Sequence, residues 1–340
     1  MDKVTMIGID LAKNIFWLHG ADERGRMVFS KKMSRAQLPE FIVKLQPCTI
    51  AMEACSSAHF WGRKFIKMGH EVKLISPQFV KPFVKSNKND AKDSEAIVEA
   101  ASRPSMRFVA VKTTEQQEIL SLHRVREQVV GNKTALINEL RGLLGEYGII
   151  IPKQASNVKK YILEILEDDA NELTSGMRVL INDLYCELKK MIERVLVFDE
   201  KIKDLSKKSE VCTLLETIPG IGPTTSTAMA ASVGNAKNFK NGRELSAWLG
   251  LVPKQYSSGG KQILGRISKR GDVYVRKLLV HGARTVLRYA KNKEDVVSKK
   301  WNTLAERIGH NKACIAIANR NARVAWAVMT TGSPYRTEVM

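Results

Sequence analysis

The sequence predicts an α/β domain at the N-terminal end of the chain, followed by a mostly helical region. Within residues 1–110, strand-length apolar runs come first and then alternate with segments of helical spacing, which is typical of a mixed sheet covered by helices. Beyond residue 114, apolar side chains recur at helical spacing over two long segments. A proline- and glycine-rich turn then joins two further helical segments in the last third.

The expected sheet begins with an apolar run over residues 4–9 that leads to Asp10. Two more strands are expected over residues 15–19 and 27–31, with turn residues at 22–25 between them. The other elements expected in this domain are a helix at 35–45, a buried strand at 48–52, a helix at 57–68, a strand at 72–75 and a helix at 90–101.

Two long helices are expected next, over residues 115–147 and 177–205. The second carries an apolar stripe of nearly heptad spacing, made of Leu180, Leu184, Leu188, Met191, Val195, Phe198, Ile202 and Leu205. Two interpretations stay open: the stripe packs the helix on its own domain, or it forms a coiled-coil arm for self-association. The expected domains are therefore an α/β domain at 1–150, a helical coiled-coil-like arm at 151–209 and a C-terminal domain at 210–340.

The chain is strongly basic. It carries 55 Lys and Arg against 35 Asp and Glu, a net charge of +20. Residues 236–340 hold 21 of the basic and 6 of the acidic residues, whereas residues 111–235 are nearly neutral. A field of this sign attracts polyanions, which include nucleic acids, membrane surfaces and acidic proteins. The uneven distribution favours a binding surface in the C-terminal third over a general solubilising charge.

The five cysteines are scattered, with no spacing that is typical of zinc ligands. A reduced, cytosolic setting fits this pattern. We expect no signal peptide, because the first residues lead directly into a strand-like run. We also expect no membrane span, because no apolar run approaches about 18 residues.

Four acidic residues indicate a metal site. Asp10 and Glu53 each follow an expected strand, and Asp90 and Asp93 lie three positions apart, on one face of the expected helix. Glu95 faces away on this helix and is left out of the set. Like charges repel unless a cation joins them, and Mg²⁺ prefers carboxylate oxygens. Two such ions about 4 Å apart can activate one oxygen and stabilise another during phosphodiester transfer.

Each carboxylate also has a plainer interpretation. Asp10 can simply begin a turn, and Asp90 or Asp93 can be the N-cap of its helix, for which Asp90 is well placed. Taken singly, these structural interpretations are favoured. The combination of two strand-end acids with a helical pair is what indicates a metal-dependent enzyme acting on nucleic acid.

A second motif lies within residues 214–234. A helix is expected to end near Thr217, a turn follows over residues 219–223, and a helix of small residues begins near Thr224. This is the pattern of a helix-hairpin-helix. Its glycines, Gly220 and Gly222, let backbone N–H groups approach a phosphate at a helix N-terminus, although such hairpins also serve as packing elements.

The mostly helical last third is interrupted by a glycine-rich stretch at residues 257–271. Two hydroxyls, Ser257 and Ser258, precede a double glycine there. Physical reasoning alone favours a flexible loop that hydrogen-bonds phosphates, because a serine nucleophile needs a base or a metal-polarised phosphate. The basic residues in this stretch and just before it are candidates for contacts with the nucleic-acid backbone or form a solvated basic loop: Lys254, Lys261, Arg266, Lys269 and Arg270.

Five segments occur together in one order: GIDLAK, MEAC, NKNDAKDSEAI, IPGIGP and SSGGK with GRISKRGD. With these motifs, essentially the whole chain closely resembles transposases of insertion-sequence family 110, in particular subgroup 1111. The resemblance implies a ribonuclease-H-like (RuvC-like) fold for the N-terminal domain, as in Holliday-junction resolvases. Asp10, Glu53, Asp90 and Asp93 would then bind Mg²⁺.

The resemblance also implies a covalent mechanism. A serine of the C-terminal domain would attack the DNA backbone and form a phosphoserine link. The family's Tyr-(Ser/Glu)-Ser-Gly pattern falls on Ser258, and Ser257 is the alternative nucleophile.

Two kinds of partner follow from the same resemblance. Family members are guided by a structured RNA from the mobile element, which pairs with donor and target DNA. They act as homo-oligomers, with dimers assembling into tetramers, and one active site joins the resolvase-like domain of one subunit with the serine domain of another. A bacterial, cytoplasmic and nucleoid-associated protein is expected.

Two other functions remain alternatives. One is a resolvase-like nuclease that hydrolyses branched DNA with water and forms no covalent intermediate. The other is a non-enzymatic architectural DNA-binding protein that uses the hairpin.

Overall fold

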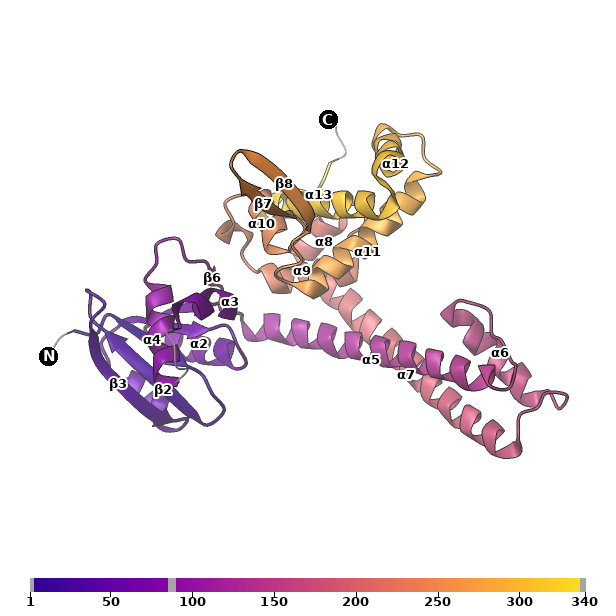
Figure 1. Cartoon of the computed structure of the whole chain (residues 1–340), viewed down its shortest axis with the longest axis horizontal. Helices are drawn as coiled ribbons and strands as arrows, with labels where there is room; N and C mark the ends of the chain where they lie inside the picture. The colour runs from indigo at the N-terminus through magenta and orange to yellow at the C-terminus, as the bar shows by residue number, and fades with distance from the viewer. Residues whose placement is uncertain (1–2, 85–89, 337–340) are drawn as a thin grey trace. The chain divides into compact units, whose positions relative to one another are not determined.

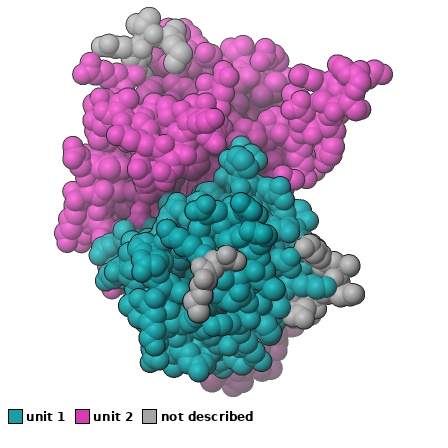
Figure 2. Space-filling view, turned by 90° about the vertical axis from the view of Figure 1, so that its left-hand side faces the viewer, with its two compact units in different colours: residues 1–115 teal, residues 116–340 magenta. Residues whose placement is uncertain are grey.

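The computed structural model describes residues 3–84 and 90–336. The chain divides into two compact units, residues 1–115 and residues 116–340, which are coloured separately in Figure 2. The three-part division expected at residues 150 and 209 stays a prediction. No helix in the described ranges is long and apolar enough to cross a membrane.

Six strands of the first unit form one mixed sheet (Figure 1). They are β1 (Met6–Asp10), β2 (Ile15–Ala21), β3 (Met27–Ser34), β4 (Thr49–Glu53), β5 (Glu71–Ile75) and β6 (Phe108–Val109). Across the sheet the order is β3-β2-β1-β4-β5-β6. The first three strands form an antiparallel meander, β4 and β5 continue parallel to β1, and β6 is antiparallel to β5. The expected α/β domain with a mixed sheet is confirmed.

Helices cover both faces of this sheet. They are α1 (Gln37–Ile42), α2 (Ala58–Lys67), α3 (Pro77–Val80), the 3₁₀ helix η1 (Lys81–Phe83) and α4 (Asp90–Ala101). Alternate residues of β4 point to opposite faces, so that Ile50 packs with Trp61 of α2 while Ala51 packs with Ile97 of α4. A sheet buried on both faces explains why its central strands are continuous apolar runs.

Helix α1 is shorter than the helix expected at 35–45. Strand β3 continues to Ser34, which still pairs with Ile15. The side-chain oxygen of Gln37 then accepts a hydrogen bond from the backbone N–H of Ser34 at 3.0 Å. The strand therefore extends to Ser34, and α1 begins only at Gln37.

The second unit is mostly helical, as expected. Its helices are α5 (Thr114–Gly145, which begins at the end of the first unit), α6 (Ala155–Glu167), α7 (Ser175–Lys207), α8 (Glu210–Glu216), α9 (Pro223–Val233), the 3₁₀ helix η2 (Ala236–Asn238), α10 (Gly242–Trp248), α11 (Val273–Ala290), α12 (Val296–Ile308) and α13 (His310–Thr331). The two longest, α5 and α7, pack on each other with α6 to form one apolar cluster.

Part of the expected heptad stripe of α7 is buried within this chain. Leu188, Val195 and Ile202 are buried, and Arg126 of α5 forms an ion pair with Asp199 of α7 at 2.5 Å. Leu180, the first residue of the expected stripe, is 45% exposed, and its neighbour Ile181 is buried instead. The helix thus packs on its own domain. Self-association through the arm stays a prediction.

The C-terminal core brings the α8–α9 turn against α11. Gly220 in this turn has φ +88°, a conformation that side chains rarely adopt, and an added Cβ would lie 2.8 Å from the carbonyl oxygen of Gly282 on α11. An added Cβ on Gly282 would in turn collide with the carbonyl oxygen of Gly220. The two glycines therefore allow close contact between the turn and the helix.

A β-hairpin overlaps the glycine-rich interruption expected at residues 257–271. Strands β7 (Pro253–Ser258) and β8 (Lys261–Ile267) pair antiparallel and are joined by Gly259 and Gly260, both with positive φ. A two-residue loop with positive φ at both positions suits the twist of a hairpin. The structure therefore has a regular two-stranded ribbon where a flexible loop was expected.

Candidate metal centre and serine hairpin

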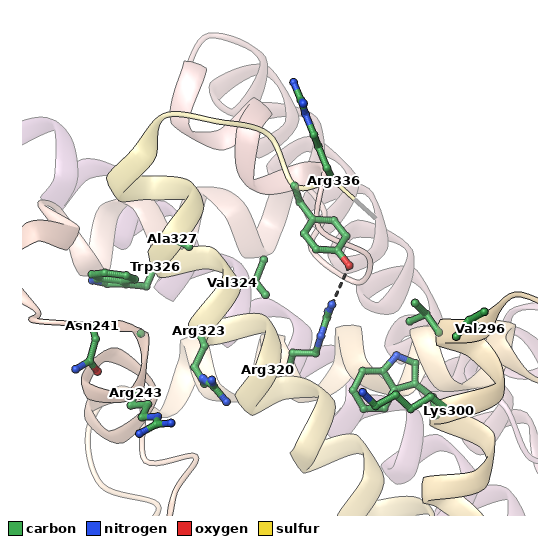
Figure 3. A pocket seen from close by; sticks show the side chains of 14 residues that line it. Asn241, Arg243, Val296, Lys300, Arg320, Arg323, Val324, Trp326, Ala327 and Arg336 are labelled. Carbon is green, nitrogen blue, oxygen red and sulfur yellow. Dashed lines mark hydrogen bonds between the residues drawn. The ribbon is translucent and has the colours of Figure 1, made fainter. Parts of the chain in front are cut away.

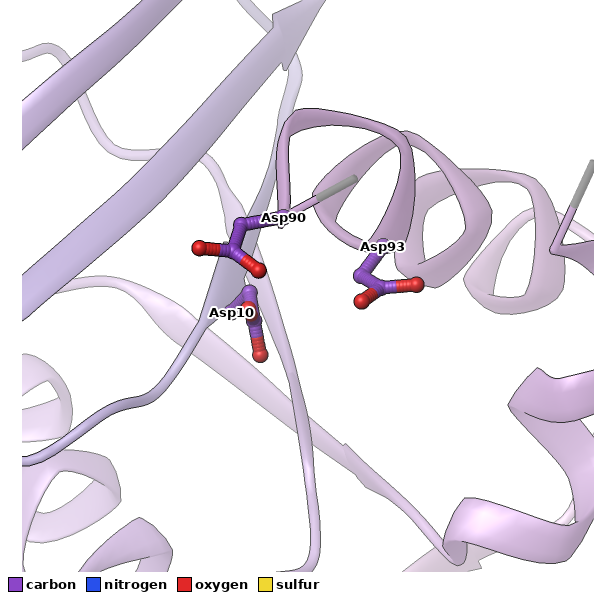
Figure 4. A group of neighbouring side chains, drawn as sticks. All are labelled: Asp10, Asp90 and Asp93. Carbon is purple, nitrogen blue, oxygen red and sulfur yellow. The ribbon is translucent and has the colours of Figure 1, made fainter. Parts of the chain in front are cut away.

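Three of the four predicted carboxylates lie together in the first unit. Asp10 is the last residue of β1, and Asp90 and Asp93 stand in the first turn of α4. One carboxylate oxygen from each lies within 4.8 Å of the others, and Figure 4 shows the three side chains directed into the same space. Asp90 is exposed, whereas the other two are partly buried. The structure therefore places the helical pair opposite the end of the strand.

Gly8 is the reason that α4 can approach β1 so closely. An added Cβ at this position would collide with the backbone oxygen of Ser94 and would lie 2.7 Å from a methyl group of Val98. Both contacts are made by α4, one turn or more beyond Asp90. The absent side chain therefore lets the helix lie against the strand and bring its first turn to Asp10.

Replacing Gly8 by alanine is expected to destabilise the first unit by about 1–3 kcal/mol, the usual cost of overpacking a tight contact. The helix must move away from the strand, so the metal affinity of the three aspartates should fall as well. Thermal unfolding and calorimetric Mg²⁺ titration measure the two effects. Gly131→Ala is the matched control, because an added Cβ there meets nothing within 4 Å. An unchanged melting temperature and metal affinity in Gly8→Ala would refute this account of the contact.

Glu53 is not in the group of three, but it ends the neighbouring strand. Ile9 of β1 lies opposite Met52 of β4, and the two strands are parallel, so Asp10 and Glu53 are the next residues along each strand. The carboxylates of both residues also act on Cys55. Burial raises the pKa of the Cys55 thiol, and the negative charges of Glu53 and Asp10 raise it further. Asp10 and Glu53 thus lie beside each other at the ends of neighbouring parallel strands.

The chemistry of these side chains suits a hard divalent cation. Three carboxylates in close proximity repel one another, and a cation among them removes that repulsion. Carboxylate oxygens are the ligands that Mg²⁺ and Mn²⁺ prefer, whereas softer metals favour thiolate and imidazole. Burial raises the pKa of Cys55, the thiol noted beside the group, which disfavours the thiolate form that softer metals bind. The residues present fit a divalent metal bound by oxygen.

The predicted nucleophile lies in the second unit, at the tip of the β7–β8 hairpin. Ser258 pairs with Lys261, and Tyr256 pairs with Ile263. Because side chains alternate along a strand, these four residues share one face of the ribbon. Ser257 points to the other face, where its hydroxyl accepts a hydrogen bond from the side-chain amide of Gln255 at 2.9 Å. The geometry thus places the two candidate serines, which are adjacent in the sequence, on opposite faces of the ribbon.

The surroundings of the hairpin tip are exposed. Both strands are exposed along nearly their whole length, including Tyr256 at 65% and Ile263 at 60%. A two-stranded ribbon of this kind has little stability by itself, and large apolar side chains at its surface are typical of a contact surface. The five basic residues predicted to contact nucleic acid are likewise exposed: Lys254, Lys261, Arg266, Lys269 and Arg270.

The two glycines of the predicted helix-hairpin-helix have different surroundings. Gly220 packs on α11, and this close contact is a structural explanation for a glycine at the position. Gly222 is the N-cap of α9, and an added Cβ there would meet nothing within 4 Å. Only the second of the two has open space at the helix N-terminus. Phosphate binding by this turn stays a prediction.

Cys55 is a residue near the acidic group that the sequence analysis did not connect with it. The cysteines were considered only for metal-ligand spacing, and a single thiol two residues after Glu53 gives no such signal. The loop that contains it also holds Ser57 with φ +68°, an uncommon conformation for a residue other than glycine. The position of the strand end could have indicated Cys55, since the residues that follow a strand also border the site.

Comparison with known proteins gives consistent results over the whole chain. The family model described as "Transposase IS116/IS110/IS902 family" matches residues 212–297, and a DEDD transposase model of the IS110 group matches residues 7–149. The chain is 46% identical to the transposase for insertion sequence element IS1111A of Coxiella burnetii, over 99% of this chain and 92% of that protein.

Two further relatives have similar coverage. A probable family 20 transposase of Pseudomonas aeruginosa is 46% identical over 98% of this chain and 99% of its own length. The transposase for insertion sequence element IS1328 of Yersinia enterocolitica is 41% identical, again over 98% of this chain and 99% of its own. Matches of this extent cover nearly all of both units.

Proposed function

Because this chain belongs to the IS116/IS110/IS902 family of insertion-sequence transposases, we propose that it cuts and rejoins DNA through a covalent phosphoserine intermediate. The observation that carries the proposal is the convergence of Asp10, Asp90 and Asp93 within 4.8 Å at the end of β1. The DEDD transposase match over residues 7–149 covers all four predicted acids. The mixed sheet is compatible with a ribonuclease-H-like, RuvC-like domain.

In this mechanism the four carboxylates would hold Mg²⁺, and the ion would supply a Lewis acid for the scissile phosphate. The Ser258 hydroxyl attacks phosphorus, the bond from phosphorus to a sugar oxygen breaks, and that oxygen takes up a proton to become a free hydroxyl. The proton lost by the serine balances the one gained by the leaving oxygen. The free hydroxyl of another strand then attacks the phosphoserine, which restores Ser258 and joins new DNA ends.

Lys261 is the side chain best placed to assist Ser258. It is the cross-strand partner of the serine on the same ribbon face, so its ammonium group can neutralise a phosphate that approaches the hydroxyl. Lys254, Arg266, Lys269 and Arg270 extend the positive surface of the hairpin and its flank towards the DNA backbone. Gly222 and the turn at Gly220 are proposed to add a helix N-terminal phosphate contact.

The partners follow from the family. A structured RNA from the mobile element pairs with donor and target DNA, so base pairing chooses the sequence while the protein binds shape and charge. Carboxylates and serine belong to different compact units, and we propose that they meet between subunits of a dimer or a tetramer. A net charge of +20 suits a protein that must hold RNA as well as DNA in the bacterial nucleoid.

The proposal is tested with purified full-length protein, end-labelled element DNA and the RNA transcribed from the element's noncoding end. Denaturing gels should show a protein–DNA adduct that requires both Mg²⁺ and the RNA. Protein purified gently from cells that express the whole element should also carry one discrete RNA. Cleavage without any adduct would favour the water-using nuclease, and binding without cleavage would favour the architectural protein.

A further inference from the structure

A cavity of about 700 Å³ opens in the second unit (Figure 3), and no residue of β7 or β8 is among those that line it. It lies between the start of α10, α12, α13 and the segment after α13. Its volume is within the range of about 300–1,000 Å³ that is usual for ligand pockets. Five cations and three aromatic side chains line it: Arg243, Lys300, Arg320, Arg323, Arg336, Trp301, Trp326 and Tyr335.

The charged side chains that line this cavity are all positive. Among the described residues, no carboxylate lines it and none of its five cations forms an ion pair with another side chain. Four of the cations are exposed, and Arg320 is partly buried. Cations gathered without counter-charges repel one another and produce a strong positive field in a concave surface. An anion is therefore the ligand that this arrangement favours.

The aromatic side chains are held in place by the protein. Arg320 donates a hydrogen bond to the hydroxyl of Tyr335 at 2.8 Å, and its guanidinium lies 5.8 Å from the ring centre of Trp301. The indole N–H of Trp326 points to the carbonyl oxygens of Ala236 and Phe239, both at 3.1 Å. Fixed rings lose little entropy when a flat ligand stacks on them.

The cavity also leads towards the α8–α9 turn. Trp301, Arg320 and Tyr335 border a second cavity, which reaches Pro219 and Gly220 of that turn. The backbone N–H of Tyr335 donates to the hydroxyl of Thr217 at 2.8 Å, so the segment after α13 is attached to the end of α8. A chain-like ligand in the first cavity can therefore continue towards the α8–α9 turn.

We propose that this cavity binds an unpaired nucleotide of a nucleic-acid strand, with its base on the aromatic side chains and its phosphates on the arginines. Arginine presents a planar fork that matches phosphate, and stacking on an aromatic ring is worth about 1–3 kcal/mol per base. A duplex keeps its base faces stacked inside and cannot use the rings. The site deepens the proposed function, because a guide RNA and opened DNA both contain unpaired nucleotides.

Strand binding is measured in the Ser258→Ala background, so the result does not depend on cleavage. The pocket variant R243A/R323A/R336A is compared with K201A/K207A/K208A, which removes three exposed charges from α7 and the residue after it. Fluorescence anisotropy is recorded with single strands of about 16 nucleotides, the upper site size of common strand-binding domains. The pocket variant should bind at least tenfold more weakly than the control. Its slope of log K against log salt should fall by about 2, from three lost contacts at about 0.7 each.

Cross-linking distinguishes the source of the strand. Single strands that carry 5-iodouracil are irradiated with the protein, once as RNA and once as DNA, and the attached peptides are sequenced by mass spectrometry. Attachment at Trp301, Trp326 or Tyr335 is expected. The strand that gives the higher cross-linking yield, RNA or DNA, is identified as the natural ligand. Equal weakening in both triple variants, attachment only outside the cavity, or displacement by a polyglutamate peptide as effective as the oligonucleotide would overturn the proposal.

Discussion

Asp10→Asn is expected to reduce strand cleavage by at least about 10²-fold while the protein still binds DNA. Asp10 lies where β1 meets the first turn of α4, so its carboxylate would help Asp90 and Asp93 to hold a divalent cation. The amide keeps the shape but removes a negative charge. Charge stabilisation by a catalytic metal is worth several kcal/mol, and about 1.4 kcal/mol corresponds to a tenfold change in rate. Single-turnover cleavage of labelled element DNA at saturating protein measures the loss.

The matched control for this prediction is Glu95→Gln, which removes one negative charge from the same helix. Glu95 is two positions from Asp93 and is absent from the group of three carboxylates. Its variant should cleave within about threefold of the unchanged protein, because it removes a charge of α4 that is not in the group of three carboxylates. A calorimetric Mn²⁺ titration adds a readout that is independent of cleavage. Asp10→Asn protein that cleaves at the original rate and binds metal as before would rule out the site.

Asp10 and the Asp90–Asp93 pair could be predicted because each depends on local sequence. An acid directly after an apolar strand, and two acids three apart on a helix, are set by periodicity alone. Their convergence could not be predicted in this way, because it depends on how α4 packs on the sheet. Gly8 allows that packing, yet a single glycine in an apolar run gives no sign of which element will lie against it.

The same limit explains what was missed in the second unit. The β7–β8 ribbon is exposed on both faces, so it lacks the alternation of apolar and polar residues that indicates a half-buried strand. The double glycine of Gly259 and Gly260 was its one local signal.

The basic cavity draws on positions from Asn241 to Arg336, and no spacing rule connects Arg243 with Arg320. The α7 stripe was partly right because burial follows helical period, but Leu180 shows that heptad spacing drifts on a straight helix.

Ser258→Ala is expected to abolish the covalent protein–DNA adduct, whereas Ser257→Ala should retain it within about threefold. The two serines have opposite directions on the ribbon. Ser258 shares a face with the Lys261 ammonium group, which can hold a phosphate beside the hydroxyl. Ser257 faces the other way, and its hydroxyl is occupied by the Gln255 amide. Denaturing gels with labelled DNA measure the adduct.

Mass spectrometry of the trapped adduct provides the sharper test, because it names the attached residue. A DNA fragment on Ser258 in the unchanged protein and in Ser257→Ala is the expected result. Lys261→Gln should lower the rate of adduct formation but leave the attachment site unchanged, since a cation that only positions the phosphate does not choose the nucleophile. A fragment on Ser257 would show that the ribbon turns its other face to DNA. Cleavage that persists in S257A/S258A would mean that water attacks the phosphate, and the carboxylates would then belong to a nuclease.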